Sequence, residues 1–127
     1  MFHELHLPFP PSDNNYYVKT KQGQFISQKG RKFRADVLEA VREQSHADYP
    51  LQDKLLVEVV LHVPDKRIRD ILNYQKALMD ALSKAGIWAD DVQIDQAHIY
   101  RGNQIFGGKT RVYIHDAGPI LPYNMIP

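Results

Sequence analysis

Short runs of apolar residues predict four strands along the chain. Residues 54–63 (KLLVEVVLHV) are rich in Val and Leu and are followed by a proline, so they predict a buried strand. Residues 2–7 predict a first strand, which ends at a proline-rich loop. Residues 92–100 and 109–115 predict two further strands. The glycine-containing stretch 102–108 between them is typical of a hairpin loop, so we expect these two strands to pair.

Helical periodicity predicts two helices between these strands. Ser27 is a good N-cap for a helix that runs to about Ser45. Its expected apolar face consists of Phe33, Val37, Leu38 and Val41. Asn73 is the expected cap of a second helix, and Gly86 is its expected stop. The apolar stripe of this helix consists of Ala77, Leu78, Ala81, Leu82 and Ala85. The order β-α-β-α-β-β predicts an α+β (mixed α/β) fold with a four-stranded mixed sheet and two helices.

Length and composition are typical of one domain, which we place at residues 1–117, followed by an extended proline-rich tail at 118–127. The chain has 127 residues, of which 43% are hydrophobic, so it can bury a core without covalent cross-links. It has no cysteine, which excludes disulfides, thiolate metal sites and cysteine nucleophiles. We find no signal peptide and no run of about 18 apolar residues, so we expect a cytoplasmic protein without a membrane span.

The net charge of +1 hides an uneven distribution. Residues 14–35 contain six basic side chains and no acidic one, and residues 66–69 (KRIR) form a second basic cluster directly before Asp70. Acidic side chains gather at Asp90, Asp91 and Asp95. Basic surface around carboxylates suits a phosphodiester-cleaving enzyme, because cations bind the backbone and carboxylates bind a metal. An ordinary solvated surface has the same composition, so charge alone does not decide between the two.

Asp70, Lys76, Asp90 and Asp91 are the candidates for chemistry. The chain makes a helix after Asp70 and returns to the sheet within about 20 residues, so Asp70 and Asp91 can converge. Converging carboxylates bind Mg²⁺ or Mn²⁺, and a nearby lysine stabilises developing charge. Each residue also has a plain alternative. Arg69 and Asp70 can form a surface ion pair, Asp90 and Asp91 a turn, and Lys76 an exposed helix position.

The combination of these residues resembles a known family. Residues 64–77 (PDKRIRDILNYQKA), 80–82 (DAL) and 85–91 (AGIWADD) closely resemble the core of the RusA Holliday junction resolvases. Residues 7–12 (LPFPPS), followed by Asn14, Tyr16 and Tyr17, look like the N-terminal loop of that family. The spacing matches from about residue 5 to about residue 115, which makes this much more specific than a single short motif.

The resemblance implies a homodimeric, Mg²⁺-dependent endonuclease of bacterial or phage origin, with Mn²⁺ as the alternative ion. Such an enzyme makes paired nicks in opposing strands of four-way DNA junctions. The metal-binding carboxylates of the family match Asp70 and Asp91, with Asp90 adjacent, and the essential lysine matches Lys76. The catalytic set is therefore Asp70, Lys76 and Asp91. The residues expected to bind nucleic acid are Lys66, Arg67, Arg69, Lys19, Lys29, Arg31 and Lys32.

Leu72 departs from the family pattern, in which a second Asp follows the first after one residue. In an extended segment, residues two apart point the same way, so the usual second Asp would face the same metal as Asp70. Leucine is no ligand and removes one negative charge, so we expect impaired catalysis. Three explanations stay open: an inactivating change, a degenerate member that still binds junctions, or compensation by a neighbouring acid such as Asp90 or Asp95.

Two other functions remain open at this stage. The chain could bind junctions without cutting them, since basic surface alone supports structure-selective binding. It could also be a general nucleic-acid-binding domain in which Tyr16, Tyr17 and Tyr74 stack on bases. The six histidines form no paired metal-ligand motif, and no glycine-rich phosphate loop is present, so nucleotide hydrolysis is disfavoured.

Overall fold

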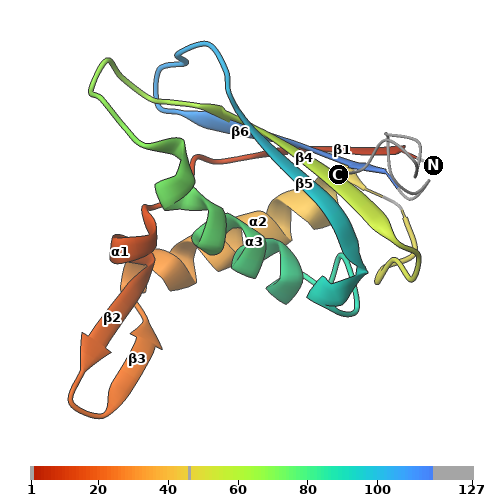
Figure 1. Ribbon diagram of the computed structural model, residues 1–127, viewed down its shortest axis with the longest axis horizontal. Coiled ribbons are helices and arrows are strands. Elements are labelled where there is room, and N and C mark those ends of the chain that lie inside the picture. Colours follow the sequence, from red (N-terminus) through yellow and green to blue (C-terminus); the bar gives the residue numbers. More distant parts are fainter. Residues whose placement is uncertain (1, 46, 116–127) are drawn as a thin grey trace, which may run out of the picture.

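A four-stranded mixed sheet with helices on one face forms the body of the protein in the computed structural model, which describes residues 2–45 and 47–115 (Figure 1). In spatial order the strands are β1 (Phe2–Leu7), β6 (Lys109–His115), β4 (Leu55–His62) and β5 (Ile94–Arg101). β4 pairs with β5 in parallel and with β6 antiparallel, and β6 pairs antiparallel with β1. The predicted α+β (mixed α/β) class with a four-stranded mixed sheet is confirmed.

β4 lies at the centre of the sheet and carries much of the core. Every second residue from Leu55 to Leu61 is at most 2% exposed and belongs to the main hydrophobic cluster. In the adjacent strands, Val112 and Ile114 of β6 are fully buried beside them. Strand side chains alternate between the two faces, so this register points one set of β4 residues at the helices. The predicted buried strand at residues 54–63 is confirmed.

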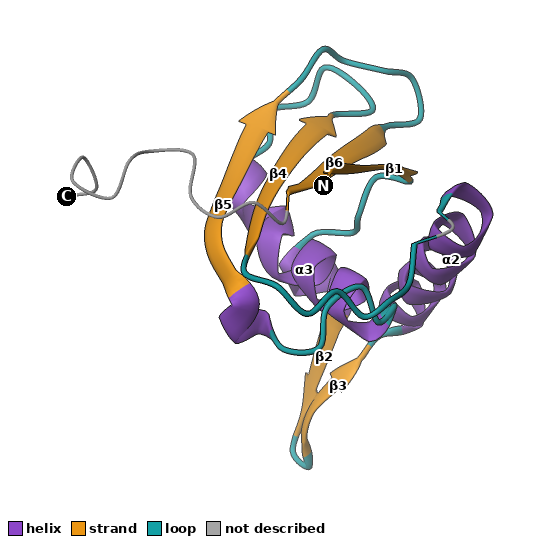
Figure 2. Cartoon of the chain, turned by 90° about the vertical axis from the view of Figure 1, so that its right-hand side faces the viewer, coloured by secondary structure: helices purple, strands orange, loops and turns teal. Residues whose placement is uncertain are grey.

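Two main helices cover this face, as Figure 2 shows. α2 (Gln28–Gln44) begins at the predicted N-cap, where the Ser27 hydroxyl accepts from the Gly30 N–H at 3.0 Å. It buries Phe33, Val37 and Val41 as predicted, whereas Leu38 is only half-buried. α3 (Gln75–Lys84) buries Ala77, Leu78, Ala81 and Leu82 of the predicted stripe, whereas Ala85 is the C-cap and is only half-buried. Among the described residues, no helix is long and apolar enough to cross a membrane.

The start of α3 differs from the prediction. Asn73 is not its N-cap, because a 3₁₀ turn, η1 (Ile71–Tyr74), precedes the helix and contains Asn73. The residue that caps this turn is Asp70, whose carboxylate accepts from the Leu72 N–H at 3.0 Å. Helical backbone therefore begins at residue 71, before the first residue of the apolar stripe. The stripe does not reveal this turn, because the turn's residues do not belong to the stripe.

The predicted pairing of the last two strands is wrong. β5 and β6 are not neighbours, because β4 lies between them, and the 102–108 loop crosses the end of β4. Backbone bonds hold this loop to β4 and to the residue that follows it, from the Gly102 N–H to the Leu61 carbonyl (2.9 Å) and from the Ile105 N–H to the Val63 carbonyl (3.1 Å). β5 also begins at Ile94 rather than at residue 92, because residues 91–93 form a second 3₁₀ turn, η2 (Asp91–Gln93).

A second, two-stranded sheet was not predicted from the sequence. After the short helix α1 (Asp13–Tyr16), strands β2 (Tyr17–Thr20) and β3 (Gly23–Ile26) form a hairpin that projects away from the main sheet (Figure 1). Most of its residues are exposed. Because the hairpin has no face packed on the core, its sequence does not alternate between apolar and polar residues. The expected tail at residues 118–127, and the end of the domain at residue 117, lie outside the described residues.

The contact between α1 and α2 leads to a stability prediction at Gly30. A Cβ on this residue would lie 2.5 Å from the Tyr16 carbonyl oxygen and 2.9 Å from a methyl group of Ile26. The Tyr16 carbonyl also accepts from the Ser27 N–H, so it has little room to move. We expect Gly30→Ala to lower the free energy of unfolding by about 1–3 kcal/mol, although alanine is the better helix former.

Urea unfolding followed by circular dichroism measures this change. Lys29→Ala is the matched control, because Lys29 is exposed on the same turn, and we expect it to change stability by less than about 0.5 kcal/mol. Wild-type stability of Gly30→Ala would contradict the close approach of α1 to α2.

Candidate active site

An open pocket of about 400 Å³ lies where α3, α1 and the loop before β5 meet. Its lining includes two of the predicted catalytic residues, Lys76 and Asp91, so the structure brings these two together. Leu72 also lines the pocket and is 62% exposed, which places the residue that departs from the family pattern inside the site. Two further acidic side chains in the lining, Asp13 and Asp80, were not among the predicted residues.

α3 points its polar residues into this pocket. Lys76 and Asp80 are four residues apart, so they lie on one face of the helix, while the neighbouring Ala77 and Ala81 are fully buried. The Lys76 ammonium lies 5.0 Å from the centre of the Tyr17 ring, which is within cation–π range. Burial, together with the nearby carboxylate of Asp80, raises the pKa of Tyr17, so this phenol stays neutral and remains a suitable partner for the lysine.

Asp91 is positioned by the core. Its Oδ1 accepts a hydrogen bond of 2.7 Å from the indole N–H of Trp88, which is only 2% exposed. A buried indole has few alternative positions, so this bond fixes the direction of the carboxylate. Asp91 is itself exposed at the pocket, which suits a residue that must contact substrate or metal.

Asp90 has a structural role in the same loop. Its Oδ1 accepts from the Val92 N–H at 3.0 Å. Asp90 and Gln93 also form a capping box around η2, in which the Gln93 side chain accepts from the Asp90 N–H at 2.8 Å. The sequence allowed Asp90 and Asp91 to form a turn instead of a metal site, and this is the turn that Asp90 caps. Asp90 does not line the pocket, so its assignment as a metal ligand stays a prediction.

Asp70 lies beside the pocket rather than in its lining. Its Oδ1 caps η1 through the Leu72 N–H, and the side chain is exposed. This cap fixes the chain direction between Asp70 and Leu72. The predicted catalytic and metal-binding roles of Asp70 remain predictions.

Asp13 and Asp80 tie the walls of the pocket together. Asp13, on α1, accepts from the backbone N–H of Ala77 in the first turn of α3 at 2.8 Å. Asp80 accepts two bonds from the Arg34 guanidinium, at 2.6 and 3.0 Å, and a short bond from the Tyr16 hydroxyl. Burial, and then the bond to Asp80, raises the pKa of Tyr16 well above its usual range, so its hydroxyl keeps the proton that it donates.

These two residues lay outside the sequence prediction because their contacts are long-range. Asp13 is 64 residues from Ala77, and Tyr16 is 64 residues from Asp80. Asp80 stood within the quoted family motif, but its spacing gave no sign that Arg34 would pair with it.

A divalent metal would find oxygen donors here but no complete cage. Among residues 2–45 and 47–115, no three histidine or acidic side chains come close enough to hold a metal ion. Mg²⁺ is commonly held by one or two carboxylates, with water and substrate phosphates completing its shell. The carboxylates of Asp70 and Asp91 have the chemistry for that mode, and Leu72 supplies no oxygen. The donor types therefore fit the ion, while most of its ligands would have to come from elsewhere.

The predicted nucleic-acid-binding residues fall into two groups. Lys66, Arg67 and Arg69 lie on the loop after β4, whereas the others lie on β2 and on the first turns of α2. The second group consists of Lys19, Lys29, Arg31 and Lys32. Lys19 lines a small hollow next to the pocket together with Asp13 and Tyr17. Arg31 donates to the Ile26 carbonyl at 3.0 Å.

Lys32 pairs with an acid one helical turn away, Asp36, at 2.8 Å. Lys29 lines a hollow beside the proline-rich loop. The group therefore mixes exposed cations with cations already used within the fold, and DNA contact by its members remains a prediction.

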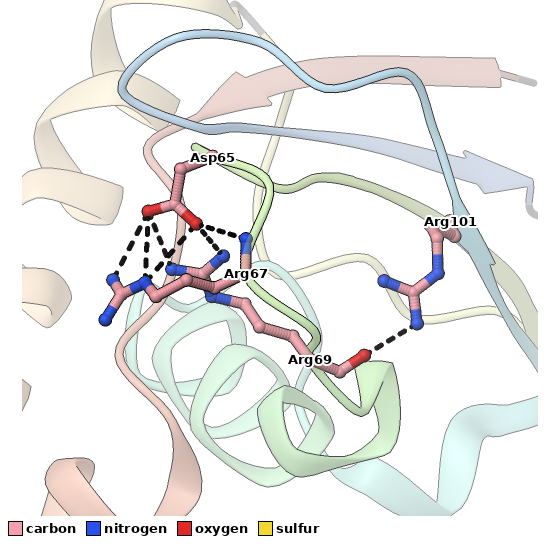
Figure 3. A network of polar contacts seen from close by, with 4 residues as sticks. All are labelled: Asp65, Arg67, Arg69 and Arg101. Atoms are coloured by element: carbon pink, nitrogen blue, oxygen red, sulfur yellow. Dashed lines mark hydrogen bonds and ion pairs between the residues drawn. The ribbon is translucent and has the colours of Figure 1, made fainter.

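Arg69 forms an ion pair with Asp65. The surface ion pair between Arg69 and Asp70 that the sequence allowed does not form. The two terminal guanidinium nitrogens of Arg69 donate to the two carboxylate oxygens of Asp65, at 2.6 and 3.1 Å, and we call this paired contact the fork (Figure 3). The Arg67 guanidinium lies 3.3 Å from the same carboxylate. These bonds, that of Arg69 first, hold the pKa of Asp65 well below its usual range. The Arg69 side chain is 12% exposed, and its carbonyl accepts from the Arg101 guanidinium at 2.7 Å. Arg69 therefore organises the loop.

Comparisons with known proteins identify the family of the chain. The family described as Endodeoxyribonuclease RusA matches residues 8–115. A protein of Enterobacteria phage HK97, named crossover junction endodeoxyribonuclease rusA, is 39% identical over 108 residues, which are 85% of this chain and 89% of the phage protein. Proteins of the same name from Enterobacteria phage 82 and from Escherichia coli strain K12 are 34% and 33% identical over 116 residues, covering 91% of this chain and 96% of each relative. The chain belongs to the RusA endodeoxyribonuclease family.

Proposed function

We propose that this chain is a Holliday junction resolvase, a crossover junction endodeoxyribonuclease that makes paired nicks in four-way DNA junctions. The observation that carries the proposal is family membership over residues 8–115, together with one pocket that holds Lys76 and Asp91. The relatives from two phages and from Escherichia coli bear the name of this activity. A symmetric homodimer would present two such pockets to a substrate of near two-fold symmetry.

In the proposed reaction, Asp70 and Asp91 would hold the Mg²⁺ ion, with Mn²⁺ as a possible substitute. The ion would supply charge neutralisation at the scissile phosphate and a more acidic bound water. Lys76 would donate to the developing negative charge on phosphate oxygens, and its contact with Tyr17 limits where the ammonium can lie. Trp88 would hold the Asp91 carboxylate in position.

The test uses a labelled mobile four-way junction with MgCl₂, and the wild-type chain beside Asp70→Asn. Symmetric nicking that Asp70→Asn abolishes would support the proposal. Junction binding by both proteins without cleavage by either would favour a binding protein of the same fold, a function that Leu72 at the pocket wall would explain. A wild-type chain that does not bind the junction at physiological salt would overturn the proposal.

Leu72→Asp should increase the activity of this chain. Residue 72 is exposed in the pocket, so a carboxylate there adds an oxygen ligand without entering the core. We expect the nicking rate at limiting MgCl₂ to rise by about 10-fold or more, and the concentration for half-maximal rate to fall. Leu72→Asn is the matched control, because it has the same shape without the charge. An unchanged dependence on MgCl₂ in Leu72→Asp would show that residue 72 does not face the metal.

Lys76→Gln should lower the nicking rate by about 100-fold, because it removes a positioned cation from the developing charge. The control is Lys84→Gln, which removes an exposed lysine from the last turn of the same helix. Gel shifts in EDTA measure junction binding separately, and we expect both variants to bind within about twofold of wild type, since one phosphate contact of many is lost. Equal nicking rates for the two variants would exclude a catalytic role for Lys76.

Trp88→Phe tests the positioning of Asp91. The substitution keeps an aromatic ring in the core and removes the N–H that donates to the carboxylate. We expect a loss of about 10-fold in nicking rate, as is typical when a partner that orients a ligand is removed. Junction affinity in EDTA should stay unchanged, and thermal unfolding checks that the variant is folded at the assay temperature. A wild-type nicking rate in the folded variant would mean that Asp91 does not need this bond.

A further inference from the structure

Two loops at one end of the sheet each present a large apolar side chain to water. Ile68, on the loop after β4, is fully exposed, and Phe106, on the loop between β5 and β6, is 98% exposed. Of the described large apolar side chains, these two are the most exposed. Single exposed apolar residues are common, so exposure alone says little. The rigidity of the loops and the charges around them distinguish this pair.

Phe106 is held out on a closed turn. The Gly108 N–H donates to the Ile105 carbonyl at 2.8 Å, which makes Phe106 the second residue of a four-residue β-turn. Gly107 has a φ of +80°, as the third position of a type II turn requires. Gly108 packs so closely on Phe9 that an added Cβ would lie 2.6 Å from the Phe9 Cβ. The backbone that carries Phe106 is therefore fixed in place.

The loop that carries Ile68 is also held in place, and it is bonded to the loop that carries Phe106. The fork between Asp65 and Arg69 closes it, and Figure 3 shows the Arg101 guanidinium reaching across to the Arg69 carbonyl. Arg101 ends β5, where the 102–108 loop begins, so this bond and the one from the Ile105 N–H to Val63 link the two loops at their bases. Ile68 and Phe106 thus project from one braced end of the molecule.

The exposed charges beside these side chains are mainly positive. Lys66 and Arg67 directly precede Ile68 in the sequence and are exposed, and Arg101 is exposed at the base of the other loop. Asp65 already lies in the fork with Arg69. A partner that offers both negative charge and flat apolar surface would match this end. DNA has both, but an intact duplex hides the faces of its bases within the stack. A branch point, where stacking is interrupted, exposes them.

We propose that Phe106 and Ile68 contact base faces exposed at the branch point of a DNA junction, while Lys66, Arg67 and Arg101 bind the flanking phosphates. The proposal rests on the proposed junction substrate and adds to it a means of telling a junction from a duplex. Stacking of a base on an aromatic side chain is tolerant of sequence, because every base has a π-face. Insertion of an apolar wedge beside a base step is likewise favoured where stacking is already broken.

The test measures binding without cleavage, in EDTA, to a four-way junction and to a duplex of the same sequence. We expect Phe106→Ala to lower junction affinity between about 5- and 150-fold, the range for loss of one stacked base, and to leave duplex affinity within about twofold. Ile68→Ala should have a smaller effect in the same direction. Phe25→Ala is the matched control, because Phe25 is 52% exposed on the β2–β3 hairpin and should change neither affinity.

A 2-aminopurine base at the branch point gives a second readout. Its fluorescence reports stacking, so the wild-type protein and Phe106→Ala should differ in the signal at saturation, while Phe25→Ala should match the wild type. A wild-type chain that prefers the junction, together with a Phe106→Ala variant of the same preference and fluorescence, would overturn this inference alone. A wild-type chain without any preference for the junction would overturn the proposed function and this inference with it.

Analytical ultracentrifugation separates a further outcome. Because both side chains are exposed, we expect the two variants to keep the oligomeric state of the wild type. A change of that state in Phe106→Ala or Ile68→Ala would mean that the loops form a protein interface, and the proposed base contact would then be wrong.

Discussion

The packing of α3 against α2 within the main hydrophobic cluster is the constraint on which the site depends. Ala77 and Ala81 are fully buried in this cluster, so the rotation of the helix about its own axis is fixed. The residues that precede them, Lys76 and Asp80, then have to face the pocket. The chain enters the helix through the turn that Asp70 caps, and it leaves through the turn that carries Asp91. The buried stripe thus determines where Lys76 lies, while Asp70 and Asp91 are placed by the turns before and after the helix.

Some carboxylates around the pocket are bonded within the fold, and others are exposed to the pocket. Asp80 is neutralised by Arg34, and Asp13 is bound to the amino end of α3, so both hold α1, α2 and α3 together. Asp91 is oriented by a buried indole yet exposed to the pocket. With leucine at position 72, the chain has fewer carboxylate oxygens available to a cation than the number of acidic side chains near the pocket indicates.

The sequence predicted those parts of the fold whose cause is local. Periodicity located β4, α2 and α3, and the Ser27 cap was correct, because burial and capping leave a pattern within a few residues. The predicted pairing of the last two strands was wrong because a glycine-containing loop is compatible both with a hairpin and with a crossing over the end of β4. The β2–β3 hairpin was missed because it has no buried face. Of the predicted catalytic set, Lys76 and Asp91 line one pocket and Asp70 does not, whereas Asp13 and Asp80 were not predicted, since their partners lie far away in the sequence.

The fork between Asp65 and Arg69 has a thermodynamic consequence for any nucleic acid that approaches this end of the molecule. The sequence places three cations at residues 66–69, but one of them is already matched by a carboxylate and nearly buried. Each phosphate contact releases condensed counterions and adds about 0.9 to the slope of log K against log salt for duplex DNA. The cluster therefore contributes to that slope as about two charges rather than three. Arg69, the third cation, instead stabilises the shape of the loop, and this contribution does not add to the salt dependence of DNA binding.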